Sequence, residues 1–407
     1  MMAPAIRYEE AQNRLAEALT PVAGTESCPL ADCLGRLSAY DVVSGIMLPQ
    51  TTNAAVDGYA FAASSQQDKI FTIIGVAKAG HPFTGPVGPN EAVRILTGAI
   101  MPDGADTVIM LEFCTVAGDQ LSLGQTLKVG KNARPAGENL SLGEVLISRN
   151  EVITEAHIGQ AAAAGYSSLL LYRPIKVGVF STGDELIFPK QPLAAGQIYD
   201  SNRPLIMSLL QRWGVIIQDY GIIADDEEAV RAALQQAHQE CDLIICSGGA
   251  SEGDEDHLQT ALAKEGAVSL FWRLAMKPGR PMAAAQLGQT PVLSLPGNPV
   301  AVYVCMTLFA LPAVQALMTG HFKLPRRIAV QAGFKAQKKP QERAEFIRVA
   351  CEITEEGHFV AMPHGRKGAG VLSSLTGADG LAELPFEASE IAEGDWLSVI
   401  PLPHLLT

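Results

Sequence analysis

Three short apolar segments of this chain each stop abruptly in small, glycine-rich or acidic residues. The segments and the loops that follow them are 176–180 with Ser181–Glu185, 242–246 with Ser247–Asp256, and 291–294 with Leu295–Pro299. Continuous apolar runs of this length are typical of buried parallel strands, and open α/β sheets bind ligands at the carboxyl ends of their strands. Exposed backbone amides beside several carboxylates therefore predict one site for an anionic ligand and a divalent cation.

Each of these loops also has a purely structural explanation. Ser247–Ser251 can cradle a phosphate with its backbone amides, or it can be a tight strand-to-helix turn that needs glycine. The acidic groups Asp184–Glu185, Asp225–Asp226 and Asp254–Asp256 can ligate Mg²⁺ together with a substrate phosphate, or they can cap helix N-termini. Acidic groups at three strand ends of one sheet favour the metal site.

The charge balance limits how an anion can be bound. With 30 Lys and Arg against 43 Asp and Glu, the formal net charge is −13, which argues against non-specific nucleic-acid binding. Local cations must therefore overcome a repulsive overall field. The loop Lys277–Pro281 carries two cations braced by prolines, with Arg343 and Arg348 as further candidates. Braced cations can hold an oxyanion at low ordering cost, although Lys277–Pro281 by itself also fits a solvated basic turn.

Two small-residue turns in the N-terminal half each carry one reactive side chain. They are Asn53–Ala60, which contains Asp57, and Leu96–Ala99, which contains Thr97. The pattern alone does not distinguish these two residues from ordinary turn residues.

Composition indicates an ordered protein of several domains in a reducing compartment. The chain has 407 residues, 48 % of them hydrophobic, enough for two to four domains. Its seven cysteines form no Cys-x-x-Cys pair, and no export signal opens the chain, so we expect a cytoplasmic protein. The apolar run 300–318 contains Pro312 and Gln315, which favours a helix of the core or of a subunit interface over a membrane span. The run is too long and apolar for an exposed surface, so in the interface alternative a partner subunit would cover it.

The distribution of strand-like and helix-like segments along the chain predicts three regions. Residues 1–172 open with an amphipathic helix, marked by Ala11, Leu15 and Leu19, and continue in short β-like runs that predict one or two small β domains. Residues 173–320 alternate strands and helices, which predicts a doubly wound α/β sheet. Residues 325–407 return to short strands and turns and predict a small β-barrel.

Taken together, the motifs resemble the molybdopterin molybdenumtransferase family, which includes MoeA and the gephyrin E domain. The matching segments occur in the family's order and cover essentially the whole chain. They are Val56–Ala60, Leu96–Ala99, Ser181–Leu186, Tyr199–Asn202, Gly221–Asp226, Ser247–Ser251, Lys277–Pro281 and Leu295–Val300.

The resemblance implies the last step of molybdenum cofactor biosynthesis. Adenylylated molybdopterin and molybdate would be converted, with Mg²⁺, to the molybdenum-loaded cofactor and AMP. It also implies a homodimer with a central molybdopterin-binding domain like that of MoaB and MogA. Contacts with an adenylyltransferase and with molybdoenzyme maturation proteins are further expectations.

The resemblance also assigns residues. It implies an active site made by Asp57, Thr97, Glu185, Asp225 and Asp256, with the last three as Mg²⁺ ligands. The substrate- and oxyanion-binding set is Ser247, Gly248, Gly249, Ser251, Lys277, Arg280, Pro296, Pro299, Arg348 and Ser373. Three positions depart from many relatives, which have Asp at Asn139, Lys at Arg280 and Ser at Ala301.

Two other functions remain open at this point. A molybdopterin adenylyltransferase shares the α/β domain, but it needs neither the large N-terminal region nor the terminal β region. A non-catalytic scaffold of the same fold is the second, and retention of Asp57, Glu185, Asp225 and Asp256 argues against it.

Overall fold

A computed structural model describes residues 5–67, 69–248, 257–338, 342–355, 357–366 and 368–402. The chain forms two compact units. One contains Met1–Glu26 and Tyr172–Thr407, and the other contains Ser27–Leu171.

Helix α1 (Tyr8–Ala18) belongs to the first unit, where it contacts strand β18 and helix α7. From the sequence we had placed this helix with the β-rich region. Its buried stripe, which includes Ala11 and Leu15, instead packs against the α/β domain, because the apolar partner surface decides where an amphipathic helix lies.

The first unit is built on a six-stranded sheet with the order β16-β13-β17-β21-β20-β18. Its strands are β13 (Lys176–Thr182), β16 (Ile216–Ile223), β17 (Leu243–Ser247), β18 (Val268–Trp272), β20 (Ala283–Leu287) and β21 (Thr290–Leu295). The first four in this order run parallel, and β20 is antiparallel to both of its neighbours. The strand β20 was absent from the sequence-based expectation.

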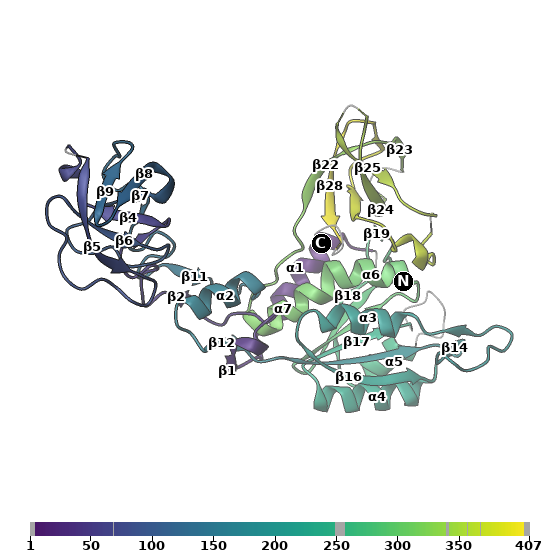
Figure 1. The fold of residues 1–407 in the computed structure, drawn as a ribbon. Coiled ribbons are helices and arrows are strands. Elements are labelled where there is room, and N and C mark those ends of the chain that lie inside the picture. The colour runs from purple at the N-terminus through teal and green to yellow at the C-terminus, as the bar shows by residue number, and fades with distance from the viewer. Residues whose placement is uncertain are drawn as a thin grey trace. The chain divides into compact units, whose positions relative to one another are not determined.

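Helices cover both faces of this sheet, which confirms the doubly wound α/β fold (Figure 1). The helices are α3 (Asn202–Gln211), α4 (Glu227–Glu240), α5 (His257–Lys264) and α6 (Pro299–Cys305). The apolar sides of α4 and α5 form one core with Phe180, Ile244 and Cys246 of the sheet. Helices α3 and α6 contact each other, and they contact β13 and β21 respectively. The loops that leave β13 and β17 therefore start in the middle of a covered sheet.

The strand order reverses at β13. From β13 the chain first moves to β16 on one side and then returns to β17 on the other. The paired positions place Ser181 opposite Ser247, and Ser247 opposite Leu295. Three of the predicted loops thus start at the same edge of the sheet, at the crevice where doubly wound sheets bind ligands.

The apolar run after β21 is a core helix of the chain itself. Helix α6 continues through a π-helical turn (Met306–Ala310) into α7 (Leu311–Thr319). This helix is long and apolar enough to cross a membrane, but 83 % of its most apolar window is buried inside the first unit. The sequence predicts a core or subunit-interface helix, and the burial confirms the core alternative. Because its own unit already covers it, its composition carries no argument for a dimer.

The C-terminal residues form the predicted small β-barrel. Strands β24 (Ala344–Ile353), β25 (Phe359–Pro363), β22 (Ile328–Ala332), β28 (Trp396–Pro401) and β26 (Gly380–Leu384) close on themselves through the β24–β26 pairing. Residues such as Val330, Val349 and Val399 fill its interior. The short strand β19 (Met276–Lys277) from the α/β domain adds to β24 in parallel, so the barrel and the α/β domain share backbone pairing.

The second unit contains a six-stranded sheet of order β7-β4-β6-β5-β9-β8. Its strands are β4 (Gly58–Phe61), β5 (Ile70–Ala77), β6 (Glu91–Ile95), β7 (Thr107–Met110), β8 (Cys114–Ala117) and β9 (Gln120–Leu123). Alternate residues enter two cores: Tyr59 and Phe61 pack on one face, and Ala60 packs on the other. This alternation with a period of two is the pattern of a strand whose two faces are both covered. Helix α2 (Glu155–Ala163), β2 (Val42–Val43) and β11 (Val145–Ile147) surround a further small core.

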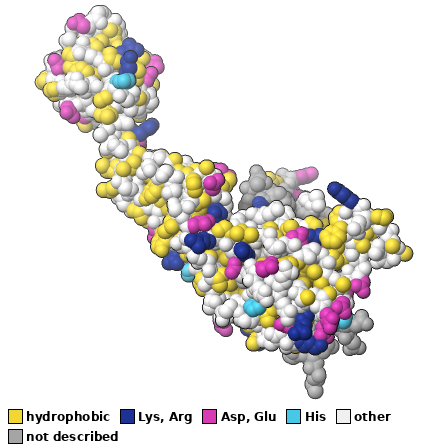
Figure 2. Space-filling model, turned by 90° about the horizontal axis from the view of Figure 1, so that it is seen from below, with side chains coloured by type: hydrophobic (Ala, Val, Ile, Leu, Met, Phe, Trp, Pro, Cys, Tyr) yellow, Lys and Arg dark blue, Asp and Glu magenta, His cyan; other side chains and the backbone are white. Residues whose placement is uncertain are grey.

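The remaining elements are short. The strands are β1 (Thr25–Pro29), β3 (Asn53–Ala54), β10 (Ala133–Arg134), β12 (Ser168–Tyr172), β14 (Leu186–Ile187), β15 (Ile198–Tyr199), β23 (Ala336–Gln337) and β27 (Glu390–Ile391). Figure 2 shows one face of the molecule, on which acidic and basic side chains are scattered in small groups.

Candidate active site at the strand ends

Asn202 joins the loops that leave β17 and β21. Its side-chain nitrogen Nδ2 donates to Ser247 Oγ at 2.9 Å and to the carbonyl oxygen of Gly297 at 2.7 Å. Ser247 Oγ in turn donates to the carbonyl oxygen of Pro296 at 3.3 Å. Two of the predicted substrate-binding residues, Ser247 and Pro296, are therefore in direct contact. Sequence reasoning placed Asn202 in a family motif but gave it no role.

Gly248 lies where only glycine fits. Its φ is +95°, a left-handed conformation. A Cβ atom at this position would overlap the carbonyl oxygen of Thr182. The loop after β17 therefore packs directly on the last residue of β13. The predicted residues Gly249, Ser251 and Asp256 lie outside the described part of the chain.

The predicted carboxylate Asp225 lies at the end of β13, next to Asp184. Thr182 Oγ1 donates to Asp225 Oδ1 at 3.3 Å, and the backbone N–H of Asp225 donates to Asp184 Oδ1 at 3.3 Å. Glu185 is exposed on the same loop. Asp226 accepts a hydrogen bond from the backbone N–H of Ala229 at 3.0 Å, so the capping explanation holds for this residue. Within the described residues, no three His, Cys, Asp or Glu side chains form a metal-binding cluster.

A pocket of about 440 Å³ lies where the barrel meets the α/β domain. Lys277 and Arg348, predicted from distant parts of the sequence, both line it. Its other charged or titratable lining residues are Lys335, Glu345, His364 and Arg366. Among these lining residues four cations face one carboxylate, in a protein of net charge −13. Such a pocket suits an anion.

Arg348 shapes the wall of this pocket. The residue is only 9 % exposed, and burial lowers the pKa of its guanidinium. Its Nε donates to Ser374 Oγ at 3.0 Å, and its Nη2 donates to the carbonyl oxygens of Arg366 and Gly368 at 3.0 and 3.2 Å. Arg348 therefore orders the loop that carries Arg366. Its hydroxyl partner is Ser374, whereas the predicted Ser373 is exposed. A pair of adjacent serines contains no signal for which one faces inward.

Glu345 is a pocket residue that sequence reasoning missed. Its Oε2 lies 3.4 Å from Lys277 Nζ, and its Oε1 lies 3.4 Å from Arg343 Nε. The pairing of β19 with β24 places Lys277 opposite Glu345. Arg280 is exposed on the same loop as Lys277. The candidate cations Lys277 and Arg343 thus share one carboxylate.

In the second unit, Asp57 and Thr97 form a hydrogen-bonded pair. Both the backbone N–H and the Oγ1 of Thr97 donate to Asp57 Oδ1 at 2.7 Å. These two hydrogen bonds lower the pKa of the Asp57 carboxyl. The pair is fixed because Gly58 pairs with Ile95 two residues before Thr97. A side chain at Gly58 would overlap the backbone of Ile109. Asp57 is therefore held ionised on an exposed turn.

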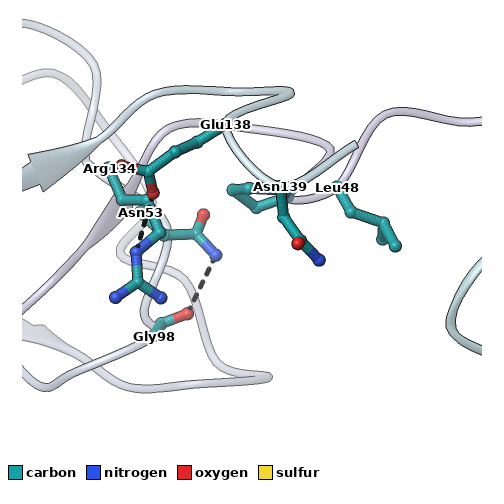
Figure 3. Close-up of a pocket in the computed structure, with 7 residues that line it drawn as sticks. Leu48, Asn53, Gly98, Arg134, Glu138 and Asn139 are labelled. Carbon is teal, nitrogen blue, oxygen red and sulfur yellow. Dashed lines mark hydrogen bonds and ion pairs between the residues drawn. The ribbon is translucent and has the colours of Figure 1, made fainter. Parts of the chain in front are cut away.

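A pocket of about 530 Å³ adjoins this turn in the same unit (Figure 3). Asn53 Nδ2 donates to the carbonyl oxygen of Gly98 at 3.2 Å, and Arg134 Nε lies 2.9 Å from Glu138 Oε2. Asn139 also lines this pocket, to which it contributes an uncharged amide. Sequence reasoning assigned no role to Arg134 or Glu138.

Comparisons with known proteins decide the family. Residues 6–165 match the model "MoeA N-terminal region (domain I and II)", residues 178–316 match "Probable molybdopterin binding domain", and residues 332–402 match "MoeA C-terminal region (domain IV)". A molybdopterin molybdenumtransferase from Haemophilus influenzae is 33 % identical over 404 residues, which are 98 % of this chain and 100 % of the relative. The chain belongs to the molybdopterin molybdenumtransferase family.

Other molybdopterin molybdenumtransferases agree with this assignment. The protein of that name from Bacillus subtilis is 32 % identical over 89 % of this chain and 86 % of its own length. The crystal structure of the molybdopterin biosynthesis MoeA protein from Pyrococcus horikoshii matches with a TM-score of 0.83 and 26 % identity, covering 98 % of this chain and 100 % of the other. The resemblance drawn from the motifs is therefore confirmed, and the chain is a transferase of molybdenum cofactor biosynthesis.

The structure gives local roles to the predicted residues Pro296 and Pro299 and to Ala301. Pro296 supplies the carbonyl oxygen that binds Ser247. Pro299 is the first residue of α6, where its missing N–H has no cost. Ala301 is 2 % exposed inside the same helix, so its methyl group packs in the core.

Proposed function

We propose that this molybdenumtransferase converts adenylylated molybdopterin and molybdate to the molybdenum-loaded cofactor, with release of AMP. The observation that carries the proposal is the basic pocket at the barrel, in the same unit as the polar loops at the strand ends. A dithiolene-bearing substrate supplies sulfur ligands for molybdenum. The protein then needs cations for the oxyanion and polar groups for the phosphates.

The pocket cations are proposed to hold molybdate and the substrate phosphates. Lys277 supplies a point charge at the rim, and the loop ordered by Arg348 presents Arg366. Pre-positioned cations bind an anion without reorganisation at the moment of binding. The proposed oxyanion-binding set also includes Ser373, as an exposed hydroxyl donor, and Arg280, as a second cation on the loop that carries Lys277.

The strand-end loops are proposed to bind the phosphates and Mg²⁺. Asp225 and Glu185 offer hard carboxylate oxygens beside one crevice, the donor type that Mg²⁺ prefers, and Asp256 completes the proposed ligand set. Mg²⁺ bound there would neutralise charge on the phosphoanhydride. Ser247 and Gly248 would orient the phosphate chain through the hydroxyl and the exposed backbone.

The active assembly is proposed to be a cytoplasmic homodimer. Its warrant is the family resemblance, which gives Asp57 and Thr97 roles at an active site although they belong to the other compact unit. Asp57→Ala and Asp256→Ala proteins, each inactive alone, should then regain some activity when mixed under subunit exchange. A protein that stays monomeric at micromolar concentration contradicts this arrangement.

Interaction with an adenylyltransferase and with molybdoenzyme maturation proteins belongs to the same proposal. The boundaries of the three functional regions, 1–172, 173–320 and 325–407, are also part of this proposal.

Molybdate-dependent release of AMP from adenylylated molybdopterin by the purified protein is the decisive experiment. Incubation with ATP and molybdopterin is its counterpart, because only an adenylyltransferase makes an AMP-linked product from them. Activity in the second assay alone would replace the proposal with the adenylyltransferase function. Absence of both activities would leave the scaffold function.

A further inference from the structure

Asn202 stands at the first turn of α3, in the crevice where the strand order reverses. Its amide orientation is determined by chemistry. The carbonyl oxygen of Gly297 can only accept a hydrogen bond, so the atom 2.7 Å away must be the side-chain nitrogen. The side-chain oxygen Oδ1 therefore makes neither of the two contacts to the loops that leave β17 and β21.

That oxygen is buried and has no hydrogen-bond partner among the described residues. Buried polar atoms of folded proteins are nearly always hydrogen-bonded, and an exception at a crevice calls for an explanation. The hydroxyl of Ser181, near the end of β13, is also buried and has no hydrogen-bond partner within the described part of the chain. One such atom thus lies near the end of β13 and the other at the start of α3.

Both atoms belong to the same side of the sheet. Ser181 is paired with Ser247 in parallel register, and paired residues of neighbouring strands point to the same face. Ser247 contacts Asn202 of α3. The preceding residues Phe180 and Cys246 enter the opposite core, with α4 and α5. Ser181 Oγ and Asn202 Oδ1 therefore lie on the α3 side of the strand ends.

A buried ion network holds Asn202 in this position. Asp200, 2 % exposed, accepts a hydrogen bond from the backbone N–H of Asn202 at 3.1 Å. Arg203 Nε donates to Asp200 at 3.0 Å, and the same guanidinium pairs with Asp219 and stacks over Phe188. A side chain fixed in this way is pre-organised and loses little entropy when a ligand binds.

We propose that Asn202 binds the substrate. Its side-chain oxygen accepts a hydrogen bond from an N–H or O–H donor of adenylylated molybdopterin, while its nitrogen fixes the two loops. An acceptor oxygen repels phosphate and molybdate oxygens, so the ligand group must carry a hydrogen. Both moieties of the substrate offer one: the pterin ring carries N–H groups, and the AMP moiety carries the ribose hydroxyls and the amino group of adenine. The inference rests on the proposed function, because it concerns the same substrate.

The test measures binding of AMP, molybdopterin and molybdate separately by titration calorimetry. Asn202→Leu keeps the volume and removes both polar atoms. The matched control is Gln286→Leu. Gln286 Oε1 is also buried and without a partner among the described residues, but residue Gln286 is paired with Pro291 on the neighbouring strand, at the opposite edge of the sheet. Thermal unfolding of both variants reports whether they fold.

Asn202→Leu is expected to bind AMP or molybdopterin about tenfold more weakly, with molybdate affinity unchanged. Loss for AMP alone assigns the donor to the adenylate moiety, and loss for molybdopterin alone assigns it to the pterin. Unchanged affinity for both, an equal loss for molybdate, or an equal loss in Gln286→Leu overturns the inference. Wild-type protein that binds neither AMP nor molybdopterin overturns the proposed function, and the inference with it.

Discussion

Lys277 and Glu345 occupy paired positions on β19 and β24, with Lys277 Nζ 3.4 Å from Glu345 Oε2. The carboxylate therefore offsets part of the positive charge in the pocket proposed for the oxyanion. A half-exposed ion pair of this kind is worth about 0–1 kcal/mol, so the competition is modest.

Glu345→Gln should tighten molybdate binding about two- to fivefold, because it removes a like charge beside the anion while keeping the side-chain shape. The molybdate dependence of AMP release measures the effect. Glu390→Gln, on the exposed strand residue Glu390, makes the same change in net charge away from the pocket. Equal shifts in both variants would indicate a long-range field effect, and no role for the Lys277–Glu345 contact.

Alanine variants of the adjacent residues Ser373 and Ser374 should have different effects, one on molybdate binding and the other on stability. Ser374→Ala leaves the buried Nε of Arg348 without its acceptor and should lower the free energy of unfolding by about 1–3 kcal/mol. Ser373→Ala should leave stability unchanged and weaken molybdate binding only. Urea unfolding and molybdate-dependent AMP release distinguish the two effects. Unchanged stability in Ser374→Ala would contradict the structural role of the Arg348–Ser374 bond.

Thr97→Val should raise the pKa of Asp57. Both hydrogen bonds from Thr97 favour the ionised carboxylate, and they hold its pKa below the usual 3.8. A lowered folded-state pKa gives stability that is present above the unfolded pKa and is lost as pH falls through the folded value. Valine keeps the backbone donor and removes the hydroxyl, so the rise should be partial. Carbon-13 NMR titration of the Asp57 carboxyl measures it, and an unaltered titration curve speaks against the hydroxyl contact.

Glu185→Gln should abolish most AMP release while the protein folds normally, because the amide keeps the size of the side chain and removes the charge that Mg²⁺ needs. The Mg²⁺ dependence of activity and the thermal midpoint are the measurements. Full turnover with unchanged Mg²⁺ dependence would remove Glu185 from the metal site.

Tyr8→Phe should weaken the attachment of the N-terminal helix to the barrel. The Tyr8 hydroxyl is buried and donates to Glu383 Oε1 at 2.6 Å, and burial with this bond raises the pKa of Tyr8. Loss of one hydrogen bond to a buried carboxylate costs about 1–3 kcal/mol, which chemical unfolding would detect. Tyr40→Phe, at an exposed tyrosine, is the control and should change nothing.

Several features followed from the sequence because they depend on local pattern. The apolar runs before Ser181 and Ser247 predicted buried strands, since a continuous apolar run fits a sheet covered on both faces. The motif order predicted the family, and net charge directed attention to Lys277 and Arg348. Both now line one pocket.

Other features appeared only in the tertiary structure. The sequence contains no signal that Glu345 neutralises Lys277, that Ser374 rather than Ser373 holds Arg348, or that α1 leaves its sequence neighbours to pack on the α/β domain. The role of Asn202 likewise depends on Ser247 and Gly297, which are distant in sequence. Residue type and spacing determine which surfaces are apolar or charged. Which of those surfaces meet is decided by packing between segments far apart in the chain, because burial favours any complementary partner and only the folded geometry selects one.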